Sequence, residues 1–467
     1  MGADTPMNHS TGSTRRDFLK SSGMVVMAGA AGYFGFDQLV RAAEQAQAIG
    51  TASTSADYDR QKPTLVTIFL RGGCDTLNAF VPYADPKYYK YRPNLAIPYQ
   101  GENKSIPILK SDYWAVNQAM KPLLPLIEDG KCVPMVNVGS PDGTRSHFSA
   151  QDNMERGCTG DHKLFNGWLN RYLEASRKPY DAPLRGLSAM SLLPRALRGP
   201  YPVLAGFNST EQMAMFEDLY SPKNLVNMTA RDEAVGESGS SLNDRPGQKR
   251  GGKIKAGLTE DMTRDIITES GANAIERIKA LDKAAATPNS SSYPSGQLGD
   301  QLRTIARVIK ANVGLEVAQA DYDGWDHHRN QGGAVGTHTN MLNHLSQCIA
   351  AFVKDMGPRM DKVMVLVMSE FGRTVQENGT SGTDHGHGSF MLAVGNMLNG
   401  GRIYGKHRSL DELDYGRFQP VTTDFRTVFA ESLSKLFHFD PFKAELFPGY
   451  KGNGKDYLDF AKQMKEV

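Results

Sequence analysis

The sequence predicts an α/β fold built on a doubly wound, mostly parallel β-sheet with an inserted cap or lid segment. Two observations support this prediction. Runs of consecutive apolar and β-branched residues, typical of strands buried on both faces, alternate along the chain with longer stretches of helical character. Polar clusters follow or precede these runs, at the positions where open α/β sheets bind their ligands.

The first predicted strand, Thr64 to Leu70, is a continuous apolar and β-branched run closed by two glycines. The same pattern predicts further strands at residues 132–138, 313–318, 363–368 and 390–394. Between and after them the spacing of apolar residues predicts helices at 118–128, 148–156, 298–310, 337–355 and 425–437. The last helix follows a Thr-Thr-Asp cap. The strand at 390–394 differs from the others because its polar cluster precedes it. This strand therefore either runs antiparallel to the others, or its loop folds back over the site.

Residues 230–255 break the alternation, because they are poor in apolar side chains and rich in Gly, Ser and charge. A helical segment at about 259–286 and a Ser/Pro-rich break at 288–296 follow. We expect residues 187–296 to form an insertion that acts as a cap or lid, and an ordinary long surface loop is the alternative. The mature chain, 49–467, is then one domain.

The N-terminus carries two consecutive arginines, Arg15 and Arg16, before Asp-Phe-Leu-Lys and a short Gly/Ala-rich apolar run at 24–36. This pattern predicts a twin-arginine signal peptide over residues 1–48, recognition by the twin-arginine translocase, and a periplasmic destination. The apolar run is too short to predict a stable transmembrane span. An uncleaved N-terminal anchor is the alternative.

The formal net charge of +2 over 467 residues, with no basic stripe interleaved with aromatics, gives no support for nucleic acid as a partner. The four cysteines, at 74, 132, 158 and 348, match no zinc-ribbon spacing. The periplasm would permit a disulfide between them. The sequence does not imply one, because a protein exported in the folded state folds first in a reducing compartment.

Metal-type side chains are concentrated in one part of the chain, since six of the eleven histidines lie between 327 and 387. Imidazoles beside carboxylates are typical ligands of divalent metals, and we expect zinc or manganese, with one or two ions bound. The predicted ligands lie next to four of the predicted strands and are Asp75, Asp326, His328, Glu370, Asp384, His385 and His387. Two of them have rival roles: Asp75 as a turn cap, and Glu370 as the partner of Arg373 in a buried ion pair.

Ser146 precedes the predicted helix at 148–156, where backbone amides favour an anion and Arg145 helps to hold one. Ser146 is therefore the candidate nucleophile, and a helix N-cap is its alternative role. His147 is a candidate ligand or base. The sequence contains no nucleophile elbow, Walker A loop or dinucleotide fingerprint.

Six motifs together resemble a bacterial family known as domain of unknown function family 1501, placed in the alkaline phosphatase and sulfatase superfamily. They cover Arg71 to Asn78, Ser146 to Phe148, Gly324 to His328, Ser369 to Thr374, Asp384 to Gly388 and Thr422 to Arg426. The resemblance spans about residues 63–447 and implies a sheet of alkaline-phosphatase-like type.

The resemblance also implies roles for individual residues. Asp75 corresponds to the metal-binding Asp of the first strand, Ser146 to the nucleophile, Asp326 and His328 to the Asp/His pair of one metal, and His385 or His387 to the late His. The chain departs from the superfamily at Phe371, where a ligand His is usual.

These expectations combine into one predicted function, an exported metal-dependent hydrolase of phosphate or sulfate esters. The substrate would be an anionic small molecule or a glycan ester, attacked by Ser146 or by a metal-bound hydroxide, with Arg145 or Arg373 neutralising the developing charge. The alternative is a non-catalytic periplasmic binding or assembly protein that keeps the fold and one structural metal.

Overall fold

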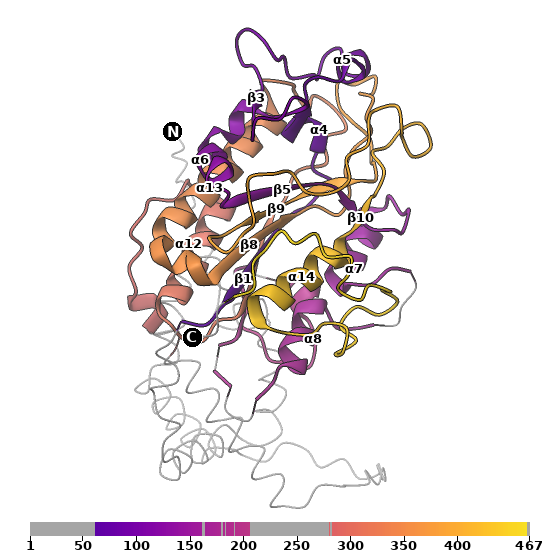
Figure 1. Ribbon diagram of the computed structural model, residues 1–467. Helices are drawn as coiled ribbons and strands as arrows, with labels where there is room; N and C mark the ends of the chain where they lie inside the picture. The colour runs from indigo at the N-terminus through magenta and orange to yellow at the C-terminus, as the bar shows by residue number, and fades with distance from the viewer. Residues whose placement is uncertain are drawn as a thin grey trace, which may run out of the picture. The chain divides into compact units, whose positions relative to one another are not determined.

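The computed structural model describes residues 61–160, 164–178, 181–182, 184–190, 192–205, 280 and 283–464. At its centre lies a seven-stranded mixed sheet in the order β10-β5-β9-β8-β1-β7-β6 (Figure 1). The strands are β1 (Thr64–Leu70), β5 (Cys132–Gly139), β6 (Gly186–Ser188), β7 (Val317–Tyr322), β8 (Val363–Met368), β9 (Ser389–Val394) and β10 (Thr423–Asp424). Helices pack around this sheet, so the predicted α/β class is confirmed.

Strand direction decides where the connecting loops meet. β1 pairs in parallel with β7 and β8, β7 with β6, and β5 with β10. β9 lies between β8 and β5 and is antiparallel to both, which confirms the first of the two possibilities for this strand. Because β9 runs backwards, the loop that enters it lies at the same edge of the sheet as the carboxyl ends of β1, β5, β7 and β8.

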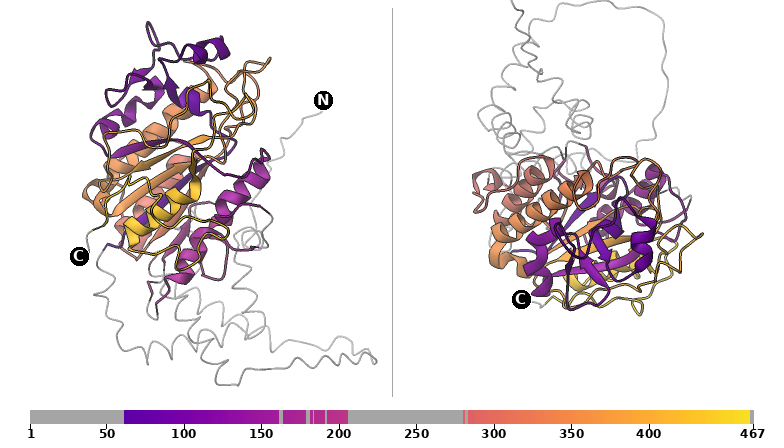
Figure 2. Two further views of the ribbon diagram at one scale, coloured as in Figure 1. Left: turned by 45° about the vertical axis from the view of Figure 1, so that its right-hand side comes forward. Right: turned by 90° about the horizontal axis from the view of Figure 1, so that it is seen from above.

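Helices cover both faces of the sheet (Figures 1 and 2). One face carries α12 (Gln297–Lys310) and α13 (Thr337–Met356), and the other carries α7 (His147–Arg156), α8 (Trp168–Ala175) and α14 (Phe425–Phe437). The core on the α14 side joins Leu65 and Phe69 of β1 to Trp168 and Phe429, whose rings stack 4.3 Å apart. Both faces of β1 are buried, as its uninterrupted apolar run requires.

The sequence did not predict a second, three-stranded sheet, formed by β2 (Phe80–Pro82), β4 (Trp114–Val116) and β3 (Ile106–Pro107). Strands of two or three residues are too short to carry a periodic signal. Short helices flank this sheet: α4 (Thr76–Ala79), α5 (Pro86–Tyr91), η1 (Gln118–Leu123) and α6 (Leu124–Glu128); η2 (Arg195–Leu197) and η3 (Gly357–Lys362) lie elsewhere.

The strand predicted at 313–318 is shifted in the structure, where β7 begins at Val317. Asn312 and Gly314 adopt φ values of 54° and 88°, which no β-strand allows, so the apolar run is interrupted by a turn before the strand starts. The predicted helix at 118–128 is divided into η1 and α6.

Several predictions lie outside the described residues, among them the signal peptide at 1–48, the linker at 230–255 and most of the insertion at 187–296. The edge strand β6 of the central sheet, Gly186–Ser188, includes the first two residues of that insertion. Within the described part of the chain, no helix has the length and apolar character needed to cross a membrane. All four cysteines are buried and free.

Candidate metal site at the edge of the central sheet

The loops after β1, β5, β7 and β8 and the loop before β9 meet at one edge of the sheet. Gly72, just after β1, has a φ of 121°, and a Cβ there would lie 2.5 Å from the backbone nitrogen of Asp326. Only glycine therefore allows the first loop to pass so close to the loop after β7. Gly386 has the same function beside Arg373, whose carbonyl carbon would lie 2.5 Å from an added Cβ.

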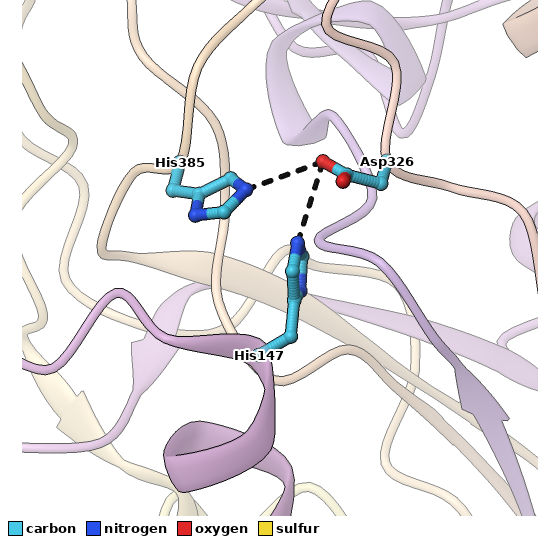
Figure 3. A group of neighbouring side chains, drawn as sticks. All are labelled: His147, Asp326 and His385. Carbon is cyan, nitrogen blue, oxygen red and sulfur yellow. Dashed lines mark hydrogen bonds and ion pairs between the residues drawn. The ribbon is translucent and has the colours of Figure 1, made fainter.

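Three side chains from three of these loops converge on one point (Figure 3). The Nε2 atoms of His147 and His385 each lie 3.3 Å from Oδ1 of Asp326, and one ligand atom from each residue lies within 4.8 Å of the other two. His328 adds a fourth group, with its Nε2 atom 3.0 Å from the same oxygen. His328 lies beside His385 and outside the three-residue group.

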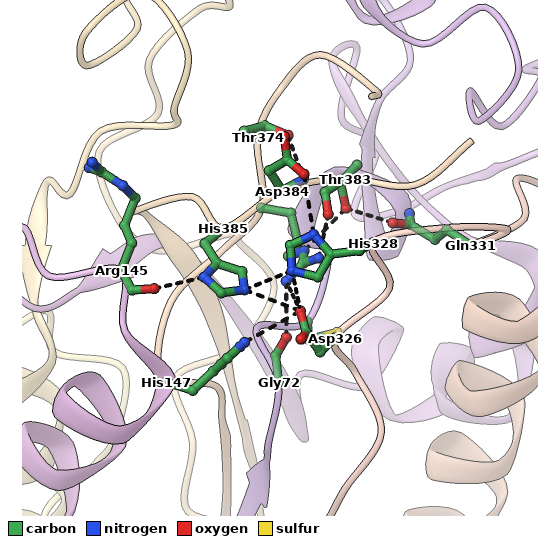
Figure 4. A network of polar contacts seen from close by, with 12 residues as sticks. Gly72, Arg145, His147, Asp326, His328, Gln331, Thr374, Thr383, Asp384 and His385 are labelled. Carbon is green, nitrogen blue, oxygen red and sulfur yellow. Dashed lines mark hydrogen bonds and ion pairs between the residues drawn. The ribbon is translucent and has the colours of Figure 1, made fainter. Parts of the chain in front are cut away.

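The partners of the Nδ1 atoms decide which nitrogen of each ring carries a proton. His385 places Nδ1 2.7 Å from the carbonyl oxygen of Arg145, and His147 places Nδ1 2.8 Å from Oε1 of Glu370. His328 places Nδ1 3.2 Å from Oδ1 of Asp384 (Figure 4). Carbonyl and carboxylate oxygens only accept hydrogen bonds, so each Nδ1 is the donor and each Nε2 of a neutral ring carries a lone pair.

When the three rings are neutral, three Nε2 lone pairs and a carboxylate oxygen thus face one another. His328 and His385 bring these atoms within 2.9 Å, which is repulsive for two lone pairs unless a proton or a cation lies between them. Nε2 of His147 is buried, and its 3.3 Å approach to Oδ1 of Asp326 does not have the geometry of a hydrogen bond. Three imidazoles and one carboxylate are a common donor set for a divalent transition metal, so the residues present fit such an ion.

Glu370 orients His147 from the end of β8. Its buried carboxylate accepts hydrogen bonds from Nδ1 of His147, from Nε2 of Gln151 at 2.9 Å, and from the backbone nitrogen of Gly72 at 2.9 Å. Burial raises the pKa of Glu370, but the hydrogen bonds from His147 and Gln151 outweigh it and hold the pKa below its ordinary value. The carboxylate in turn raises the pKa of His147. Glu370 therefore occupies the outer position of a carboxylate–histidine pair, as second-layer groups do in metal sites.

The alternative pairing of Glu370 with Arg373 does not occur. Arg373 is buried and donates from Nη1 to Oδ1 of Asp326 at 2.7 Å and to the carbonyl oxygen of Gly72 at 3.2 Å. Burial raises the pKa of Asp326, but the Arg373 guanidinium outweighs it and lowers that pKa below its ordinary value. Arg373 thus places a fixed positive charge beside the cluster.

Phe371 forms an apolar wall for the cluster. Its ring is 2% exposed and lies 4.9 Å from the ring of His147 and 5.2 Å from that of His385. Burial lowers the pKa of His385, which keeps this ring neutral and its Nε2 lone pair available at neutral pH.

The structure gives Asp75 other partners. Its carboxylate forms a buried ion pair with Arg92, with Nη2 3.0 Å from Oδ1, and it accepts a hydrogen bond from Nε2 of Gln331 at 2.6 Å. Burial raises the pKa of Asp75, but Arg92 outweighs it and lowers that pKa. Both oxygens of Asp75 are thus engaged, and Asp75 holds the Arg92 side chain in place. The alternative role of Asp75 as a turn cap is not observed either, because its side chain makes no capping hydrogen bond to α4.

His387 and Asp384 also lie outside the group of converging atoms. His387 places Nδ1 2.8 Å from Oδ2 of Asp414 and Nε2 3.1 Å from the carbonyl oxygen of Ser140, so it joins two loops instead of pointing at Asp326. Asp384 holds Nδ1 of His328 and accepts a bond from Asn378 at 3.1 Å. Both residues therefore support the loops around the cluster.

Ser146 and Arg145 lie at the start of α7. Ser146 is the N-cap residue, but its side chain makes no capping hydrogen bond and is exposed. The backbone carbonyl of Arg145 contacts His385, whereas its guanidinium points away from the cluster (Figure 4) and lies 4.8 Å from the centre of the Phe418 ring. The hydroxyl of Ser146 is thus free, between two residues that contact the cluster.

A cavity of about 170 Å³ adjoins the cluster at Asp384. Its walls include Tyr91, Gln376, Leu413 and Arg417. Because Asp384 lines this cavity and also holds His328, a molecule bound in the cavity would lie next to the cluster.

Sequence reasoning left two members of this arrangement out of the predicted set. His147 was a candidate ligand or base, and its position beside Ser146 at the carboxyl end of β5 is the signal that points to it. Gln151 lies four residues further on, the spacing that places two side chains on one face of a helix.

A family model described as "Protein of unknown function (DUF1501)" matches residues 248–429, a segment that contains Asp326, His328 and His385. The chain is therefore similar to this family over that segment, which also contains four of the six motifs. No curated protein matches the chain. Among solved structures, the PsFucS1 sulfatase from Pseudoalteromonas sp. aligns with 92% of this chain and 77% of its own at 10% identity and a TM-score of 0.35. So weak a likeness supports no conclusion about function.

Proposed function

We propose that the protein is an exported metal-dependent hydrolase of phosphate or sulfate esters, with an alkaline-phosphatase-like, doubly wound sheet. One observation carries the proposal: the Nε2 lone pairs of His147, His328 and His385 face the Asp326 carboxylate at the ligand-binding edge of the sheet. His147, Asp326 and His385 would hold a divalent ion, with His328 as the adjacent fourth donor. Zinc or manganese suits these donors.

The remaining groups would orient the site and balance charge. A bound ion would polarise the ester oxygens of an anionic small molecule or glycan ester. Glu370, Asp384 and the carbonyl of Arg145 accept hydrogen bonds from the Nδ1 atoms of the three rings. These bonds would hold each Nε2 atom in a constant orientation toward the ion. Arg373 provides a buried positive charge beside negative charge that develops on the ester.

The test is elemental analysis of protein purified from its export compartment, together with turnover of aryl phosphates, phosphodiesters and aryl sulfates. We expect about one equivalent of a divalent metal and hydrolysis of at least one ester class. Metal without turnover would favour a non-catalytic binding or assembly protein instead. Neither metal nor turnover is the result expected if Arg373, which donates to the same Asp326 oxygen that faces the histidines, keeps an ion from this carboxylate.

Ser146→Gly separates a nucleophile from a helix cap. Because the Ser146 side chain makes no capping bond, the change should alter the free energy of unfolding by only a few tenths of a kcal/mol. A nucleophile, in contrast, should lose turnover by about a thousandfold or more with stability unchanged. The measurements are kcat on the best ester and chemical denaturation. Ser149→Gly, at an exposed position in the same helix, is the control, and full turnover in Ser146→Gly would remove Ser146 from the mechanism.

Changing Arg15 and Arg16 to lysine should leave the precursor in the cytoplasm, because the twin-arginine translocase reads the arginine pair. Cell fractionation followed by immunoblotting measures the distribution. Arg41→Lys, within the same predicted signal segment, should be exported normally. Equal periplasmic amounts of the paired variant and the natural sequence would reject export by this route.

A further inference from the structure

Two arginines at the edge of the candidate site rest on the same ring. The Cζ atom of Arg145 lies 4.8 Å from the centre of the Phe418 ring, and that of Arg417 lies 5.5 Å from it. The two Cζ atoms are therefore no farther apart than the sum of these distances. Phe418 is 4% exposed and its backbone is bridged to Thr374 and Asp414, so the ring is a fixed support for both guanidinium groups.

In the described part of the chain, Arg145 and Arg417 together have one carboxylate partner, and it lies at a long distance. Arg145 is exposed and has no ion pair there, and the nearest carboxylate oxygen paired with Arg417 is Oδ2 of Asp384, 4.0 Å away. The side chain of Arg417 is 63% exposed. Asp414, the other acidic residue of this loop, is engaged by His387. Two like charges held on one ring repel each other, and a shared anion would relieve that repulsion.

Each arginine is also one contact away from a histidine of the cluster. The backbone carbonyl of Arg145 accepts the Nδ1 proton of His385, and Arg417 approaches the carboxylate that holds Nδ1 of His328. The Arg145 guanidinium nevertheless points away from the converging ligand atoms (Figure 4). The pair therefore lies beside the cluster, and the Arg145 guanidinium does not reach into it.

We propose that Arg145 and Arg417 form a binding site for a second oxyanion group of the substrate, so that the natural substrates are molecules with several sulfate or phosphate groups. This inference rests on the proposed function, because it places one anionic group at the metal cluster and another on the arginine pair. Because the Phe418 ring already holds both side chains, they lose less conformational entropy when an anion binds. The cavity lined by Arg417 and Asp384 lies next to the pair and offers space for the part of the molecule between or beyond these groups.

Isothermal titration calorimetry of the whole protein treated with EDTA tests the pair without metal or turnover. The probes are sodium tripolyphosphate in one arm and a sulfated dextran oligosaccharide in the other, and the arm that binds identifies the preferred oxyanion. We expect Arg145→Met and Arg417→Met each to weaken binding about threefold and the double variant about tenfold. Arg402, an exposed arginine 4.4 Å from the Tyr404 ring, is the matched control, and Arg402→Met should bind as the natural sequence does.

Three results would overturn the inference: no binding of either probe, unchanged binding in the double variant, or an equal loss in Arg402→Met, which would indicate only general surface charge. Failure of the proposed function would give a different result. The protein would then lack metal or turnover, but the arginine variants would still bind the probes more weakly than the natural sequence does. Conversely, an active enzyme whose double variant binds both probes normally would retain the hydrolase proposal and lose the arginine site.

Discussion

Changing His385 to alanine should abolish binding of the divalent metal that we propose, whereas the same change at His387 should leave metal binding intact. The two histidines lie two residues apart on one loop, but only His385 directs a lone pair at Asp326, while His387 is engaged by Asp414 and Ser140. Inductively coupled plasma mass spectrometry of the two variants measures the difference.

Thermal unfolding with and without EDTA gives a second measurement of the same prediction. An ion at about a hundred times its dissociation constant stabilises the folded state by about 2.7 kcal/mol, so EDTA should destabilise the natural sequence and His387→Ala but not His385→Ala. Full metal content in His385→Ala would exclude His385 as a ligand. Loss of metal in His387→Ala with retention in His385→Ala would reverse the assignment and make His387 the ligand.

Replacing Arg92 with leucine should destabilise the protein by about 3 to 5 kcal/mol, because it leaves the buried Asp75 carboxylate without its counter-charge. Both side chains are almost fully buried, at 0% and 2% exposed. Urea denaturation measures the loss. The double variant Arg92→Leu, Asp75→Asn is the control and should recover part of it, since no buried charge remains. A loss below about 1 kcal/mol in Arg92→Leu would mean that water reaches Asp75.

The pH dependence of that loss follows from the lowered pKa of Asp75 in the folded protein. A carboxylate with a depressed folded pKa contributes stability that is present above its unfolded pKa of about 3.9 and is lost as the pH falls through the folded value. In Arg92→Leu the same buried carboxyl lacks its counter-charge, so its folded pKa rises above the unfolded value. The difference in unfolding free energy between the natural sequence and Arg92→Leu should therefore shrink as the pH falls through that raised pKa. It should shrink further below about pH 4, where the natural sequence loses the contribution of Asp75. Asp75→Asn should keep its metal, because Asp75 contacts Arg92 and Gln331 and not the histidine cluster.

The sequence was most informative where one physical signal dominated. β1, β8 and α14 have the predicted bounds, because a run buried on both faces or a capped amphipathic helix is visible in the residues themselves. The small sheet of β2, β4 and β3 was not predicted, because its pairing depends on tertiary contacts that leave no local periodicity.

At the site, the sequence predicted which loops supply the groups but not how each side chain points. Asp326, His328 and His385 lie together as expected from their places beside β7 and β9. His147 and His387 were indistinguishable by composition, since each is a histidine in a loop at the same edge of the sheet. Their roles differ through their partners: Glu370 and Gln151 turn His147 inwards, and Asp414 holds His387 aside.

The three converging ligands come from segments that lie far apart in the sequence, after β5, after β7 and before β9. An ion bound there would cross-link the chain as a disulfide does, closing two long loops at once in a protein whose described cysteines are all free. Such a cross-link acts on the unfolding rate as well as on the equilibrium, so the ion-loaded protein should resist proteolysis longer than the ion-free protein. If the protein is exported as we propose, this resistance would protect it in a compartment without the chaperones of the cytoplasm.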